Sequence, residues 1–368
     1  MKSDAFAEVM AFARQTVALE QVMGRLGWDQ ETQMPQGAAE QRGEEMAALE
    51  AVLHARRSDP RLGELLAKAK APDEAAAAQL REVARSHARA VKVPGPLAQE
   101  IARVTSVAQG VWAQARAAED VAAFLPTLAE VVRLKREEGA ALAQGGDAYD
   151  ALVDDYEPGM KGADIAAMFG AMRPRLVALR ERILGASRQP KSLDGAFASD
   201  TQLRLTRRLA TVFGYDWSRG RLDIAVHPFS SGSGNDVRIT TRIAEADPFN
   251  CFYSTIHEVG HAAYEQGVDP DYLLTPIGRG ASMGVHESQS RICENQLGRS
   301  RAFTGWLYTE MRDRFGEFGA GSADDFFATV NRVQPGFIQK KKKKKKKKQH
   351  TKNHFHLHPP LIPRPPDA

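Results

Sequence analysis

Residues 257–261 read His257-Glu258-Val259-Gly260-His261, and this stretch determines how the chain around it must fold. Residues four apart lie on the same face of a helix, so the imidazoles of His257 and His261 can reach one metal ion while Glu258 lies beside it. The flanking residues are mostly apolar, which predicts a buried helix, and a buried helix keeps such polar groups only when they have partners. The spacing is typical of a catalytic zinc site in a peptidase.

Glu287 is the candidate for the third protein ligand. It follows a glycine-rich connection, residues 278–284, that is long enough for a second helix to fold back. Two histidines, one glutamate and an open fourth position make a catalytic rather than a structural zinc site. We therefore expect one zinc ion per chain, with other divalent ions such as cobalt as alternatives. Glu258 is then the candidate general base, which accepts a proton from water and passes it to the leaving amine.

Three further residues near Glu287 carry weaker predictions. Glu294 lies two turns beyond Glu287 on the same helical face, so it either orients a ligand histidine or forms a surface salt bridge. His286 is a candidate donor to the tetrahedral intermediate, although helical spacing turns it about 100° away from Glu287. Cys293 falls on a different face, which favours a buried structural thiol over a fourth ligand.

The rest of the chain is predicted to be mainly helical. Apolar residues recur at helical spacing in several segments and indicate core-facing stripes. The clearest of these stripes consists of Ile165, Met168, Phe169, Met172, Leu176, Leu179 and Ile183.

Only the segment before the metal motif departs from the helical pattern. Apolar residues alternate over 222–226 and again over 237–241, with Ser230-Ser231-Gly232-Ser233-Gly234 as a turn between them. The pattern predicts a small antiparallel sheet beside the zinc helix. An edge strand there would pair with the substrate backbone, or the hairpin would merely cover the core.

Longer segments of the chain match one known family. It resembles the carboxypeptidase Taq family of zinc metallocarboxypeptidases from near its N-terminus to about Ile338. The segments that carry the resemblance are Leu26–Arg42 (LGWDQETQMPQGAAEQR), Tyr149–Met160 (YDALVDDYEPGM), His227-Pro228-Phe229, Asp236–Thr241 (DVRITT), His257–Gly267 (HEVGHAAYEQG) and Gly284–Arg299 (GVHESQSRICENQLGR).

The resemblance implies a large helical peptidase fold and the release of C-terminal amino acids from peptides with broad specificity. It also implies a homodimer. An exopeptidase must bind the free carboxylate of its substrate, usually with arginine. Arg238 is the first candidate for that role, and Arg279 and Arg291 are weaker ones.

After Ile338 the resemblance ends and the chain continues with nine lysines, Lys340–Lys348. A run of like charges stays solvated. We therefore expect residues 340–368 to be a non-native, disordered tail, and residues 1–339 to be a helical catalytic region that is truncated at its C-terminal end. The four histidines of the tail would bind metal only incidentally.

Composition excludes several classes of function. The 368-residue chain has a net charge of +4, but the tail contributes +10 of it, so residues 1–339 carry −6 and do not suggest nucleic-acid binding. No apolar run is long enough for a membrane span, and residues 1–10 lack the apolar centre of a signal peptide. With only two cysteines, a reducing cytoplasm is the expected compartment.

Three interpretations stay open at this point. The first is a metallocarboxypeptidase. The second is an endopeptidase or peptidyl dipeptidase with the same pair of zinc helices. The third is an inactive, truncated helical protein that at most binds metal.

Overall fold

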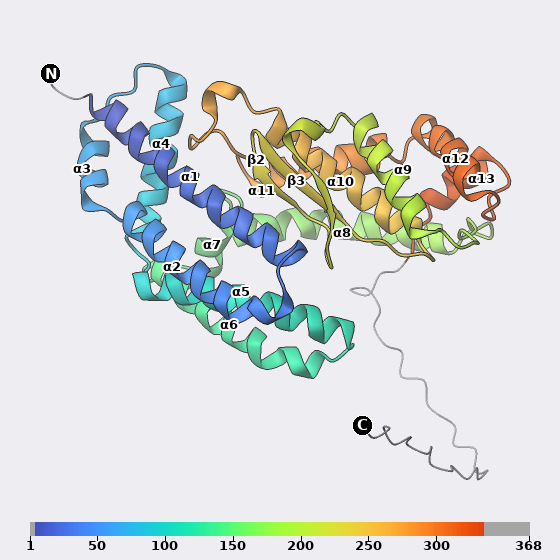
Figure 1. Cartoon of the computed structure of the whole chain (residues 1–368), viewed down its shortest axis with the longest axis horizontal. Helices are drawn as coiled ribbons and strands as arrows, with labels where there is room; N and C mark the ends of the chain where they lie inside the picture. The colour runs from blue at the N-terminus through green and yellow to red at the C-terminus, as the bar shows by residue number, and fades with distance from the viewer. Residues whose placement is uncertain (1–3, 335–368) are drawn as a thin grey trace, which may run out of the picture. The chain divides into compact units, whose positions relative to one another are not determined.

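The computed structural model describes residues 4–334, so the predicted tail, residues 340–368, lies outside the described residues. The described part is mainly helical with one small sheet, which confirms the predicted fold class (Figure 1). In the described part no helix is both long and apolar enough to cross a membrane. The helices are α1 (Ala5–Thr32), α2 (Ala39–Arg57), α3 (Pro60–Lys68), α4 (Glu74–Ala90), α5 (Gly95–Ala117), α6 (Val121–Ala143), α7 (Ala148–Val153), α8 (Gly162–Leu184), α9 (Ser199–Val212), α10 (Pro248–Gln266), α11 (Met283–Arg291), α12 (Arg301–Phe315) and α13 (Ala323–Val330).

Long-range polar contacts tie the first helices to the rest of the described chain. The buried guanidinium of Arg42 on α2 donates to the Asp29 carboxylate (2.6 Å) and to the Leu26 carbonyl oxygen (2.5 Å), both on α1. Also on α1, Arg25 donates to the carboxylate of Asp236 in the sheet at 2.8 Å. These contacts hold α1 between α2 and the sheet, so both can contribute to one cavity.

The sheet has three strands, β1 (Leu222–Ile224), β2 (Ser230–Ser233) and β3 (Asp236–Thr241), in the order β1-β3-β2. β2 pairs with β3 in antiparallel fashion, whereas β1 pairs with β3 in parallel. The predicted antiparallel pairing of 222–226 with 237–241 is therefore wrong. Four of the five residues predicted as the turn, Ser230–Ser233, form β2 instead. The turn comes after them, at Gly234, which adopts the left-handed conformation (φ +61°) and lets the chain reverse before β3 begins at Asp236.

Helix α10 lies between two parts of the core. Phe252 and Ile256 pack with apolar residues of α9, α12 and α13 on one side. Val259 and Ala262 pack against Val237 and other apolar residues around β3 on the other. A helix covered on both sides is held rigidly, so it is a good support for side chains that need fixed positions.

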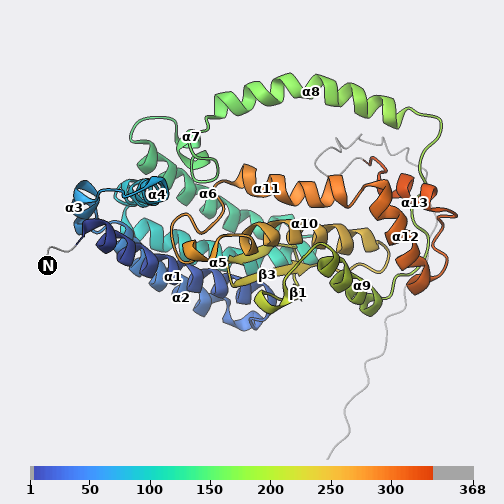
Figure 2. The ribbon, with the colours of Figure 1, turned by 90° about the horizontal axis from the view of Figure 1, so that it is seen from above.

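Helix α8 departs from the prediction. The stripe from Ile165 to Ile183 was expected in the core, yet α8 has no buried residue in the described structure, and the side chains of Met168 and Phe169 are each 53% exposed. Figure 2 shows α8, in green, running separately from the other helices. Helical periodicity identifies an apolar face but not what covers it, which is why the sequence correctly predicts the helix and wrongly predicts its burial.

Candidate metal centre

The two histidines of the metal motif lie on the one stripe of α10 that the core leaves uncovered. Asp247 begins the helix by accepting a hydrogen bond from the Phe249 backbone N–H, and Pro248 occupies the first helical position. From there to Gln266 most residues are buried, and the partly buried ones are Phe249, Asn250, Ser254, His257, His261, Ala263 and Tyr264. Among them Asn250, Ser254, His257, His261 and Tyr264 follow one another at three or four residues, which is the spacing of a single helical face.

Glu287 reaches this face from α11, because α10 and α11 approach each other very closely. A Cβ atom at Gly260 would lie 2.5 Å from the Cα atom of Ser290, so no larger residue fits at position 260 without moving a helix. Ser282 caps α11 by accepting from the Val285 backbone N–H. Glycine at the crossing therefore brings the carboxylate of Glu287 within reach of both histidines.

The three candidate ligand atoms form a small triangle. The Oε2 atom of Glu287 lies 3.2 Å from His261 Nε2 and 3.5 Å from His257 Nε2, and the two Nε2 atoms are 3.2 Å apart. Two atoms bound to one zinc ion at about 2.0–2.1 Å in tetrahedral geometry lie about 3.3 Å apart. Arg291 donates to the other carboxylate oxygen of Glu287 (2.9 Å), and Oε2, which faces the histidines, also accepts from the Ser290 hydroxyl at 3.3 Å. The three residues thus fit a tetrahedral metal ion in type and in spacing.

Each histidine of the triangle has a hydrogen-bond partner on its Nδ1 atom. His257 Nδ1 contacts Glu294 Oε2 at 3.0 Å. His261 Nδ1 contacts His286 Nδ1 at 2.5 Å, and His286 Nε2 contacts Glu265 Oε1 at 2.8 Å. Burial, followed by the neighbouring imidazoles of His286 and His257, lowers the pKa of His261, which favours the neutral ring that a metal requires.

The segment that carries Glu294 is a π-helix, Ile292–Leu297, which continues α11. The wider turn interrupts the α-helical register on which the prediction for Glu294 was based. Its carboxylate contacts His257, Arg291 and Arg299, all within 3.3 Å. The structure therefore brings Glu294 to the candidate ligand His257. The same carboxylate also forms ion pairs with two arginines.

Glu258 is the most buried of the acidic residues around the triangle, with 6% of its surface exposed. It lines the same cavity as His257 and His261. Burial raises the pKa of Glu258 to about 7, with the nearby charges of Glu287 and Glu294 adding to the effect and His257 opposing it. A carboxylate whose pKa lies near neutrality can both accept and release a proton at physiological pH.

We predict that Glu258→Gln stabilises the metal-free chain at alkaline pH. The folded state holds a proton that the unfolded state releases near pH 4.5, so the contribution of Glu258 to stability is most favourable below pH 4.5 and is lost as the pH rises through about 7. Glutamine avoids that loss, and the gain at pH 8 is up to about 3 kcal/mol. Urea unfolding with a chelator at pH 8 and pH 4 measures it, and an equal difference at both pH values would contradict the pKa shift.

The comparisons with known proteins agree on one family. The family described as carboxypeptidase Taq (M32) metallopeptidase matches residues 8–341. The chain is 39% identical over 354 residues to thermostable carboxypeptidase 1 of Thermus thermophilus, an alignment that covers 91% of this chain and 69% of that protein. This chain belongs to the carboxypeptidase Taq (M32) family.

Solved structures of the family have the same fold. The M32 carboxypeptidase from Deinococcus radiodurans R1 is 35% identical with a TM-score of 0.79, over 90% of this chain and 68% of that one. Metallocarboxypeptidase 1 of Trypanosoma cruzi is 32% identical with a TM-score of 0.77, over 90% and 68%. As a member of this metallocarboxypeptidase family, the chain is a peptide-bond hydrolase, and the family implies a metal ion.

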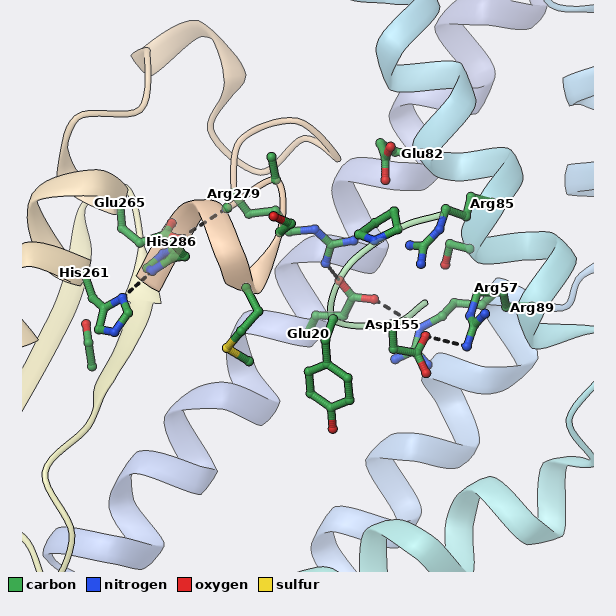
Figure 3. Close-up of a pocket in the computed structure, with 18 of the residues that line it drawn as sticks. Glu20, Arg57, Glu82, Arg85, Arg89, Asp155, His261, Glu265, Arg279 and His286 are labelled. Carbon is green, nitrogen blue, oxygen red and sulfur yellow. Dashed lines mark hydrogen bonds and ion pairs between the residues drawn. The ribbon is translucent and has the colours of Figure 1, made fainter. Parts of the chain in front are cut away.

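The M32 site opens into a cavity of about 1050 Å³ (Figure 3). His257, Glu258 and His261 line one part of it. Another part is lined by arginines and carboxylates of α1, α2 and α4, and by a loop residue, Arg279, whose guanidinium lies 3.2 Å from Glu20. A substrate in this cavity would therefore touch the candidate metal ligands and a strongly charged wall at once.

The structure does not bring Arg238 into that cavity. Its guanidinium donates to Asp236 (2.7 Å) and lies 4.3 Å from the ring centroid of Trp28. It lines a smaller, neighbouring hollow that shares Glu20, Glu265 and Arg279 with the large cavity, and its contact with the substrate carboxylate stays a prediction. Arg279 lines the large cavity, whereas Arg291 is engaged with Glu287 and Glu294.

Three other residues near the centre are His286, Glu265 and Cys293. His286 was predicted to donate to the tetrahedral intermediate, but both of its ring nitrogens are already engaged, by His261 and Glu265. Glu265 was missed altogether, although it follows His261 by four residues and so lies one turn further along the same helix. Cys293 is buried and free, in agreement with the predicted structural thiol.

Proposed function

We propose that this chain is a zinc metallocarboxypeptidase that removes single amino acids from the C-termini of peptides with broad specificity. The observation that carries the proposal is the triangle of His257, His261 and Glu287, whose two histidines line a cavity of about 1050 Å³ together with the buried Glu258. Spacing of 3.2–3.5 Å between the three atoms supports a small tetrahedral ion such as zinc over a larger ion such as calcium.

His257, His261 and Glu287 would hold the metal ion through Nε2, Nε2 and Oε2. A zinc ion bound there supplies Lewis-acid chemistry, which polarises the scissile carbonyl and makes water more acidic. Glu294 and His286 would keep the two imidazoles in place through their Nδ1 atoms.

Glu258 would act as the general base. Its buried carboxylate takes a proton from the attacking water and passes it to the nitrogen of the leaving amino acid, so the peptide bond is hydrolysed without an acyl-enzyme. In the metal-free chain burial raises the pKa of Glu258 to about 7. The positive charge of a bound zinc ion would lower that pKa and favour the carboxylate, which is the form that accepts the proton.

The charged wall of the cavity would bind the end of the substrate. Arg279 is the best supported of the three candidate arginines, because it lines the cavity and its side chain is about half exposed. An arginine–carboxylate pair requires only the terminal carboxylate and not a particular side chain, which is consistent with broad specificity. The homodimer implied by the family resemblance stays a prediction.

We predict that the chain hydrolyses peptides with a free C-terminus at least about 10- to 100-fold faster, in kcat/KM, than the same peptides with a C-terminal amide, since hydrogen bonds to charged groups contribute about 1.5–3 kcal/mol. Mass spectrometry of the products measures this, with an N-acetylated peptide as the control for the other terminus. Release of single residues supports a carboxypeptidase, release of dipeptides a peptidyl dipeptidase, and equal cleavage of acid and amide an endopeptidase.

A further inference from the structure

A row of three polar side chains, two partly buried histidines and one buried glutamate, extends from the candidate metal centre away from Glu287. It begins at His261 on α10, continues through His286 on α11 and ends at Glu265, one turn further along α10 (Figure 3). Glu265 is only 7% exposed. The row runs on the opposite side of the His261 ring from the triangle, because it starts at Nδ1 and the triangle uses Nε2.

The hydrogen bonds in this row fix where the protons lie. A carboxylate only accepts, so the Nε2 atom of His286 donates to Glu265. In a neutral imidazole the other nitrogen is then an acceptor, so His286 Nδ1 accepts from His261 Nδ1. His261 in turn carries its proton on Nδ1 and presents the lone pair of Nε2 to the triangle, which is the form that binds a metal ion.

The middle member of the row is clamped in place. The His286 ring stacks on His261 (centroids 4.7 Å apart) and on Tyr264 (4.8 Å). A Cβ atom at Gly280 would lie 2.5 Å from His286 Cδ2, so the loop before α11 closes directly over the ring. The backbone N–H of Gly280 also donates to Glu265 Oε1 at 3.2 Å. The ring therefore cannot turn away without displacing both helix and loop.

We propose that Glu265 and His286 are positioning residues of the metal centre, with Glu265 setting the tautomer and the basicity of His261 through the intervening imidazole. The inference rests on the proposed metal site and adds a role for a residue outside the triangle of candidate ligands. His257 contacts the carboxylate of Glu294 directly, at 3.0 Å. Each imidazole of the triangle is therefore linked to a carboxylate, His257 by a direct hydrogen bond and His261 through the ring of His286.

The test is zinc affinity, measured on the full chain by competition with a chromophoric chelator. Glu265→Gln keeps the shape of the side chain and removes its charge. His286→Asn keeps an acceptor near His261 and breaks the link to Glu265. We expect each to weaken zinc binding by about 10- to 100-fold, the range found for groups behind metal ligands. Glu310→Gln is the control, because Glu310 is similarly buried in an arginine ion pair on α12, away from the site.

The double variant separates positioning from general structural damage. If Glu265 acts through His286, Glu265→Gln has no further effect on zinc affinity in the His286→Asn background. Unchanged affinity in Glu265→Gln, or full additivity of the two losses, overturns the proposal. If His286→Asn does not fold, His286→Gln takes its place, with circular dichroism of the metal-free chain as the check. A parent chain that binds no zinc contradicts the proposed function instead, so the two failures are distinguishable.

Discussion

Replacing Glu258 by glutamine lowers kcat by about 10²- to 10⁴-fold while zinc stays bound, if Glu258 is the general base. Glutamine has nearly the same shape and lines the cavity in the same way, but it accepts no proton from water. The measurement is steady-state hydrolysis of a free-acid peptide together with metal analysis of the same sample.

A matched control for this variant is Glu82→Gln. Glu82 also lines the large cavity, yet it lies on α4 among the arginines and away from the triangle (Figure 3). As part of the charged wall Glu82 can affect KM, but it lies away from the triangle, so we expect its kcat to stay within about threefold of the parent. A kcat for Glu258→Gln equal to that of the control would show that another group accepts the proton.

His261→Ala and Glu287→Ala are expected to lose the metal ion and, with it, the activity. Each removes one corner of a triangle with sides of 3.2–3.5 Å and leaves two ligands, too few for a catalytic zinc site. We expect the zinc content to fall from about one ion per chain to near zero after dialysis, and affinity to fall by more than the roughly 100-fold upper range for changes behind the ligands.

His54→Ala serves as the control for these two variants. His54 lines the same cavity, but its Nε2 atom contacts the Val93 carbonyl oxygen at 2.8 Å and lies outside the triangle. It removes an imidazole without touching a ligand, so its zinc content should equal that of the parent. Full zinc occupancy in His261→Ala or Glu287→Ala would refute the ligand assignment.

The sequence predicts the candidate site where the relevant geometry is local. His257 and His261 lie one turn apart on one helix, so their spacing alone indicates that they face one point. Glu287 could be predicted because it lies in a second helix, and a glycine-rich connection before that helix lets it fold back on the first. Glu265 obeys the same four-residue rule and was missed because its partner, His286, comes from another helix, and a lone glutamate carries no motif.

The fold was predicted less completely, because much of it depends on contacts between segments that are far apart in the sequence. Helices follow from periodicity, but the exposure of α8 depends on what lies against it, and the parallel pairing of β1 with β3 depends on the path of the chain between them. Arg238 is the first candidate for the substrate carboxylate from its residue type, because arginine usually binds carboxylates. The ring of Trp28, far away in sequence, holds it elsewhere.

The contact at Gly260 has a consequence for which ions the site accepts. A Cβ atom at Gly260 would lie 2.5 Å from the Ser290 Cα atom, so α10 and α11 are already at close approach, and buried residues on both sides of α10 hold that helix in place. The distance between α10 and α11 therefore limits the radius of the ion that the three candidate ligands can bind. Ions that prefer bonds of about 2.3–2.6 Å and six to eight oxygen ligands, such as calcium, would need the gap to widen. The selectivity of the proposed centre between small and large divalent ions would thus depend partly on Gly260, which has no side chain and contacts no ion.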